Sequence, residues 1–123
     1  MHNLPWERDS GSYLERITSF LDVADSHKIG VVFVLFDSVW DPLPHAGKQP
    51  APVPGLHNSG WVQAPGAVIL RNLERHVELK GYVQGVVGRF RGDRRIHAWD
   101  IINEPDNTND NSYGRFEPRE KAR

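Results

Sequence analysis

The first clear hydrophobic pattern lies between residues 12 and 27 and has the period of a helix. Apolar side chains recur at the spacing of one helix face: Leu14, Ile17, Leu21 and Ala24, with Phe20 widening the stripe. The segment Ser12-Tyr-Leu-Glu15 has the S-x-x-E form of a capping box, so the helix is expected to begin there. Gly30 is the predicted stop signal. Residues 1–11 are predicted to form a loop, with Pro5 and Gly11 interpreted as breaks.

Two apolar runs have the composition of strands. Val31–Phe36 is continuous, β-branched and aromatic, without alternation, which is typical of a strand buried on both faces. Ile96–Asn103 is predicted to be the second strand. Pro105 follows closely and cannot donate to a strand ladder, so it ends this strand.

A second helical stretch is predicted from Ala67 to Phe90. Its apolar candidates are Leu70, Leu73, Val77, Val83, Val86, Val87 and Phe90. Three glycines at positions 81, 85 and 88 either weaken the helix or let it pack closely against a sheet. The basic run 89–95 has two interpretations, an anion-binding patch or the solvated end of this helix.

Residues 37–66 show no periodicity and are rich in proline and glycine. Loops of this length inside a compact domain are usually functional or disordered. Trp40, Trp61 and a nearly charge-free middle favour an ordered loop.

The order strand, helix, strand predicts a βαβ unit with a parallel sheet, and therefore an α/β fold. Parallel strands joined in this way point their carboxyl ends to the same edge. Asp37, the long loop and Glu104 should therefore gather at one edge, which is where α/β proteins bind ligands. The apolar surfaces of both strands have too few partners in this chain to be fully covered.

Composition excludes several classes of function. The 123 residues carry a net charge of −1, which argues against a nucleic-acid or anionic-membrane binder. The absence of cysteine excludes disulfides and thiolate metal sites, and the six histidines lack the spacing of a metal site. No cofactor is indicated. No segment has the length of a membrane span or the pattern of a secretory signal, and the localisation stays open.

Several segments together resemble one group of enzymes. The segments are Val32–Asp37, Trp40–Pro42, Gly47–Pro50, Pro54–Trp61, Gln63–Gly66 and Trp99–Pro105, the last reading Trp-Asp-Ile-Ile-Asn-Glu-Pro. They are similar to bacterial cellulase-like or 1,4-β-xylanase-like glycoside hydrolases of the family 5 type, a clan of retaining enzymes built on (β/α)8 barrels. The resemblance extends roughly from Trp6 to Asn107.

The resemblance implies a fold and roles for particular residues. Residues 1–123 would be part of a catalytic (β/α)8 barrel, about strands three and four with their helices and a polar tail over 105–123. Glu104 would be the general acid/base, and Asn103 would contact the sugar 2-hydroxyl. The nucleophile of this clan is a second Glu at the end of the seventh strand, which has no counterpart in this sequence. A complete barrel needs about 250 residues, so the chain is expected to be an incomplete TIM barrel.

The expected function of the parent family is hydrolysis of β-linked oligo- or polysaccharides with retention. Retaining chemistry needs two carboxyl groups about 5–5.5 Å apart. Asp37 is the only second carboxylate expected on the correct edge, and we interpret it as an acceptor for sugar hydroxyls. The chain alone is therefore expected to be weakly active or inactive. The alternatives are a truncated, non-catalytic remnant that binds carbohydrate weakly, and a half-barrel that pairs with a second copy through its exposed sheet edges.

Four loop residues are further candidates for substrate binding. Trp40 and Trp61 could stack on sugar rings or anchor the long loop. His57 and Asn58 could donate hydrogen bonds to substrate or brace the loop. Trp99 is interpreted as barrel packing. The sequence does not specify which sugar is bound.

Overall fold

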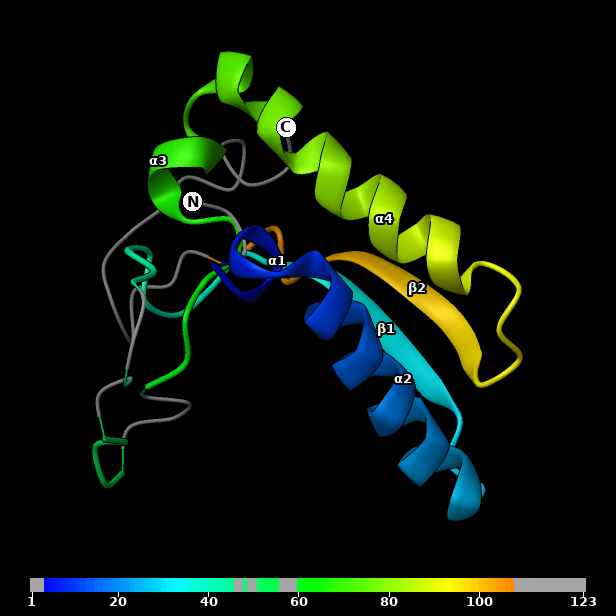
Figure 1. Ribbon diagram of the computed structural model, residues 1–123. Helices are drawn as coiled ribbons and strands as arrows, with labels where there is room; N and C mark the ends of the chain where they lie inside the picture. The colour runs from blue at the N-terminus through cyan, green and yellow to red at the C-terminus, as the bar shows by residue number, and fades with distance from the viewer. Residues whose placement is uncertain (1–3, 46–47, 49–50, 56–59, 108–123) are drawn as a thin grey trace.

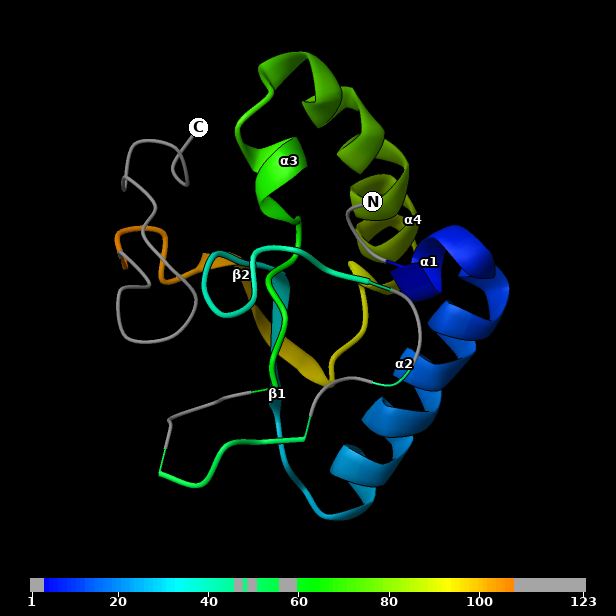
Figure 2. The ribbon, with the colours of Figure 1, turned by 90° about the vertical axis from the view of Figure 1, so that its left-hand side faces the viewer.

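A computed structural model describes residues 4–45, 48, 51–55 and 60–107. Its helices lie against one face of a small sheet, and the long loop leaves from one end of that sheet (Figures 1 and 2). In chain order the elements are α1 (Leu4–Arg8), α2 (Ser10–Ser26), β1 (Val31–Asp37), α3 (Ala67–Leu70), the 3₁₀-helix η1 (Leu73–Leu79), α4 (Lys80–Phe90) and β2 (Ile96–Asn103). No helix within these ranges is both long and apolar enough to cross a membrane.

The sheet consists of β1 and β2, which pair in parallel. The register aligns Val32 with Ala98 at one end and Asp37 with Asn103 at the other, after an irregularity at Val31. Parallel pairing and the limits of β2 agree with the sequence prediction, and β1 is one residue longer than predicted. The chain is therefore an α/β unit with a two-stranded parallel sheet.

The core lies between the sheet and helices α2 and α4. Its buried members are Leu21, Leu35, Tyr82, Val86 and Phe90. Full burial of an aliphatic or aromatic side chain of this size contributes about 1.5–3 kcal/mol. The Tyr82 hydroxyl donates to the carbonyl oxygen of Leu35 at 3.1 Å, so this buried polar group is satisfied and ties α4 to β1.

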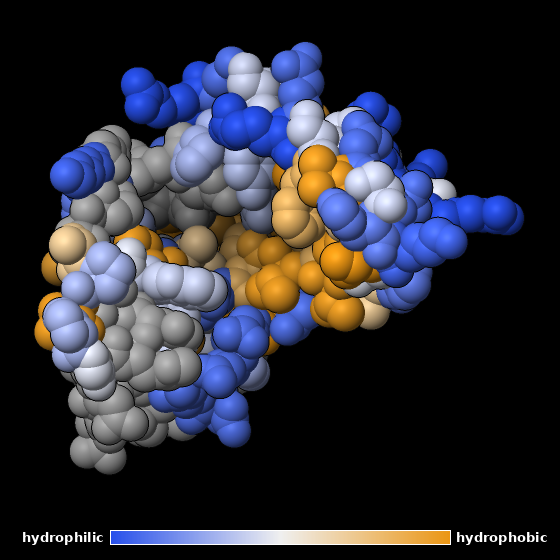
Figure 3. All heavy atoms as spheres, turned by 90° about the horizontal axis from the view of Figure 1, so that it is seen from below, coloured by the Kyte–Doolittle hydropathy of each residue, from blue (hydrophilic) through white to orange (hydrophobic). Residues whose placement is uncertain are grey.

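The opposite face of the sheet is open, and the prediction that β1 is buried on both faces is wrong. Val32 is 60% exposed and Val34 is 42% exposed, because no described helix or loop covers them. The expectation that the strands have too few partners is confirmed. Hydrophobic residues gather in a hollow in the middle of Figure 3. Asp100 pairs with Val34 in register, and its side chain has no hydrogen-bond partner in the described ranges.

The N-terminal segment is helical, which corrects the predicted loop over residues 1–11. Proline is well tolerated in the first turn of a helix, and Pro5 occupies that place in α1. Trp6 then packs edge-on against Tyr13 and Tyr82, with ring centroids 6.0 and 5.8 Å away. α1 therefore closes the end of the core.

Helix α2 begins two residues before the predicted capping box. Asp9 is its N-cap, and its carboxylate accepts from the backbone N–H of Ser12 at 3.1 Å. Leu21 and Ala24 are buried as predicted, whereas Phe20 is 61% exposed, because α2 has only the one sheet face to cover. The helix was expected to stop at Gly30. Instead Lys28, with φ 57°, is the left-handed residue that follows it.

The predicted helix over 67–90 is three shorter elements. The backbone leaves helical geometry at Asn72, whose side chain accepts from the N–H of Glu74 at 3.1 Å. Leu73 and Val77 are exposed, contrary to prediction, whereas Val86 and Phe90 are buried. All three glycines lie inside α4, and none of them ends the helix.

The basic run after α4 makes ion pairs inside the chain. Arg95 contacts Asp93 through two hydrogen bonds of 2.8 and 2.5 Å, and it reaches Asp22 of α2 at 2.5 Å. These hydrogen bonds from Arg95 lower the pKa of Asp93 to about 2. The pairing supports the interpretation of this run as a helix end.

We predict opposite effects for two glycines on the same helix. A Cβ on Gly85 would lie 2.2 Å from the Trp6 ring, whereas nothing lies within 4 Å of a Cβ on Gly88. Gly85→Ala should therefore destabilise the fold by about 1–3 kcal/mol through overpacking. Gly88→Ala, the matched control, should stabilise it by about 0.5–1 kcal/mol. Urea unfolding of both variants measures the difference, and shifts of equal sign would contradict the close packing of Trp6 on α4.

Candidate functional site

The carboxyl ends of β1 and β2 meet at one edge and bring three predicted site residues together. Asp37 is the last residue of β1 and pairs in register with Asn103, the last residue of β2. The Asn103 amide donates to Asp37 Oδ2 across a long 3.5 Å contact. Glu104 follows directly. The sequence predicted this meeting because parallel strands end on the same side.

Hydrogen bonds fix both the side chain and the backbone of Asp37. Its Oδ1 accepts from the backbone N–H of Val39 at 3.0 Å, and its own backbone exchanges hydrogen bonds of 2.7 and 3.1 Å with Ala64. Burial raises the pKa of its carboxyl group, and the nearby negative charge of Glu104 adds to the effect. Hydrogen bonds from Val39 and Asn103 and the nearby Trp40 indole lower this pKa without cancelling the effect of burial.

Glu104 has an exposed side chain on a backbone of unusual geometry. Its φ is 49°, a left-handed conformation that residues with a Cβ rarely adopt. Its Oε2 accepts from the side-chain amide of Asn107 at 2.9 Å, and its carbonyl oxygen accepts from the N–H of Asn107 at 3.1 Å. The Ser38 hydroxyl donates toward the carbonyl oxygens of both Asn103, at 2.8 Å, and Glu104.

Ser38 and Asn107 were not predicted from the sequence. Ser38 is a small polar residue after a strand, and Asn107 stands in a polar segment interpreted as loop or tail. The only available signal was their position, one residue after Asp37 and three after Glu104.

The long loop is anchored at its base beside this edge. The backbone of Asp41 accepts from the N–H of Gln63 at 2.9 Å and donates to Trp61 at 3.2 Å. Trp40 is only 8% exposed and meets Trp61 edge-on at 6.3 Å, whereas Trp61 is 60% exposed. The burial of Trp40 favours its alternative role as a loop anchor. Trp61 presents ring surface to solvent, and its role as a sugar platform stays a prediction.

The remaining candidates have different outcomes. His57 and Asn58 lie outside the described residues. Trp99 packs against Phe33 with ring centroids 5.2 Å apart, as expected for a packing residue. No group of three or more metal-ligating side chains occurs in the described ranges.

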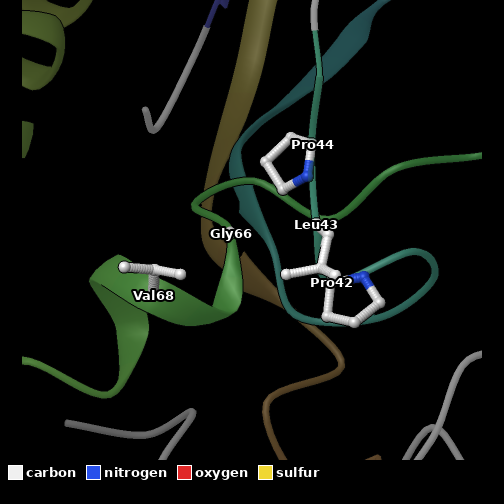
Figure 4. Close-up of a pocket in the computed structure, with 5 residues that line it drawn as sticks. All are labelled: Pro42, Leu43, Pro44, Gly66 and Val68. Atoms are coloured by element: carbon white, nitrogen blue, oxygen red, sulfur yellow. The ribbon is translucent and has the colours of Figure 1, made fainter.

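A small apolar pocket lies at the start of α3, and none of the three edge residues lines it. Pro42, Leu43, Pro44, Gly66 and Val68 line it (Figure 4). Its volume is about 120 Å³. Typical ligand pockets have about 300–1,000 Å³, so it is too small for a sugar chain. The candidate site is therefore the open strand edge.

Comparison with known proteins found no matching family model, no similar curated protein and no similar solved structure. The family resemblance of the sequence motifs therefore stays a prediction.

We predict that Asp37→Asn changes how stability depends on pH. A carboxyl group whose folded pKa is raised stabilises the fold below its unfolded pKa, near 3.8, and loses that contribution as pH rises through the folded pKa. The variant has no such charge to desolvate. The thermal midpoint of the variant minus that of the parent chain should therefore be more positive at pH 7 than at pH 3. Circular dichroism measures both midpoints. Glu15→Gln, at an exposed position away from both ends of α2, is the control and should show a much smaller change with pH. A constant difference between the Asp37→Asn variant and the parent at all pH values would contradict the burial of this carboxylate.

Proposed function

We propose that this chain carries the acid/base side of a retaining β-glycoside hydrolase site. Glu104 is the general acid/base, Asn103 binds the sugar 2-hydroxyl, and Asp37 accepts a further sugar hydroxyl. The observation that carries this proposal is the juxtaposition of Asp37, Asn103 and Glu104 at the carboxyl edge of two parallel strands. The carboxyl edge is where barrel enzymes hold their catalytic residues.

In the proposed reaction, Glu104 first acts as an acid. It gives its proton to the glycosidic oxygen while the bond from that oxygen to the anomeric carbon breaks, and a nucleophilic carboxylate bonds to the same carbon. Water then attacks the anomeric carbon and gives a proton to Glu104, and the nucleophile leaves as a carboxylate. An exposed Glu104 is accessible to both the leaving oxygen and water.

Asp37 is a poor candidate for the nucleophile. Both of its oxygens already accept hydrogen bonds, from the Val39 N–H and the Asn103 amide. Such a carboxylate is suited to orienting a neutral hydroxyl. The proposal therefore places the second carboxylate outside the residues that the structure describes.

The open sheet face supports the proposal that β1 and β2 are two strands of a (β/α)8 barrel, about strands three and four. In such a barrel, helices cover the outer face and side chains from other strands fill the inner face. Here α2 and α4 cover one face, and Val32 and Val34 are exposed on the other.

Titration with cello- and xylo-oligosaccharides tests the binding part of the proposal. We expect weak binding that shifts the indole and amide NMR signals of Trp61 and Asn103. Trp61→Ala should weaken the affinity for the oligosaccharide by about 2- to 10-fold, because one aromatic contact contributes about that much. Phe20→Ala removes an equally exposed ring from the helical side and is the control. Absence of any sugar-dependent shift at millimolar concentrations would refute carbohydrate binding.

A second candidate is a non-catalytic remnant that only binds carbohydrate, and it is favoured because both oxygens of Asp37, the second carboxylate at the described edge, already accept hydrogen bonds. Sequencing the gene on both sides of this segment separates the two. A reading frame that continues into a second strand-end glutamate supports the enzyme, whereas stop codons on both sides support the remnant.

The activity of the chain alone gives a further prediction. Because no second carboxylate stands free at the edge within the described ranges, turnover of aryl β-glycosides should not exceed that of Glu104→Gln. In a longer product of the gene, the same substitution should lower kcat/KM by about 10²–10⁴-fold. The loss should be greatest for poor leaving groups, which need protonation. Equal losses for activated and unactivated leaving groups would contradict the acid role of Glu104.

A further inference from the structure

The most constrained part of the candidate site is the turn that carries Glu104. A left-handed backbone at a residue with a Cβ persists only where surrounding contacts enforce it. Glu104 has such a backbone, with φ 49°. The contacts that hold it come from both sides of the turn and from two separate segments of the chain.

On the strand side, Ser38 fixes the backbone. It is only 1% exposed, its hydroxyl donates toward the carbonyl oxygens of Asn103 and Glu104, and its N–H donates to Asn103 at 3.2 Å. Ser38, the residue that follows β1, therefore holds the peptide groups on both sides of the Glu104 Cα.

On the other side of the turn, Asn107 contacts Glu104 twice. Its backbone N–H donates to the Glu104 carbonyl oxygen at 3.1 Å, which closes the turn over residues 104–107. Its side-chain amide donates to Oε2 at 2.9 Å. An exposed glutamate normally samples several rotamers, whereas here both ends of the residue are tied.

We propose that Asn107 is a positioning residue for Glu104, fixing the direction of its carboxylate while Ser38 fixes the backbone below it. This inference rests on the proposed function, because a fixed carboxylate direction matters for a group that must exchange a proton with one particular oxygen. Asn107 itself need not touch the substrate. Its amide leaves the second oxygen, Oε1, to face the leaving group.

The test is the side-chain conformation of Glu104 by NMR in the whole chain. The couplings between its Hα and Hβ protons should report one dominant χ1 rotamer. In Asn107→Ala they should collapse to values averaged over the staggered rotamers, while amide signals of the core stay in place. The control, Asn72→Ala, removes a similar Asn side-chain hydrogen bond at η1 and should leave the Glu104 couplings unchanged.

A reciprocal measurement uses the side-chain amide protons of Asn107. In Glu104→Gln their partner is neutral, so the hydrogen-bonded proton should move upfield, and the Asn72 amide signals should not move. Averaged Glu104 couplings in the parent chain, or couplings that Asn107→Ala leaves unchanged, would overturn the proposal. Asn107 is exposed, so its loss should not prevent folding.

This result is separable from the proposed function. If Glu104 is fixed by Asn107 but no oligosaccharide binds in the titration above, the positioning contact stands and the glycosidase proposal fails. If sugar binds and Glu104 rotates freely in the parent chain, the positioning proposal alone fails.

Discussion

The parallel pairing of β1 with β2 is the constraint on which the rest of this structure depends. Parallel strands need a long return connection, and here it supplies the loop, α3, η1 and α4. The same pairing puts both strand ends at one edge, so Asp37 and Asn103 meet although 66 positions separate them. A slip of one residue would turn one of these two side chains to the opposite face.

The pairing also explains why the core is one-sided. A two-stranded sheet is marginal by itself and depends on helices packed against it. Tyr82 is at the centre of this packing, because it contacts Trp6, Tyr13 and Phe36 and also donates to the backbone of β1. The stability of the unit therefore comes from the core on the helical side of the sheet, while the opposite sheet face contributes little.

The sequence predicted the elements whose signals are local. β2 was predicted with its correct limits because an apolar run ends at Asn-Glu-Pro. The meeting of Asp37 with Glu104 followed from topology. The α1 helix was missed because Pro5 was interpreted as a break instead of a first-turn residue. Phe20, Leu73 and Val77 were misjudged because the helical period gives an apolar stripe but not the width of the surface that covers it. Tyr82 was missed because its hydroxyl makes it look like a surface residue.

The contacts at Glu104 could not be predicted in this way, because they join two segments that are far apart in the sequence and depend on one backbone angle. A left-handed residue costs about 1–3 kcal/mol, and the hydrogen bonds from Ser38 and Asn107 offset that cost. Ser38 is also the first residue of the long loop, whose base is closed by the Asp37–Ala64 pair. The loop and the turn of Glu104 therefore share one anchor. A displacement of the loop base must move the carbonyl oxygens that Ser38 holds, and with them the direction of the Glu104 side chain.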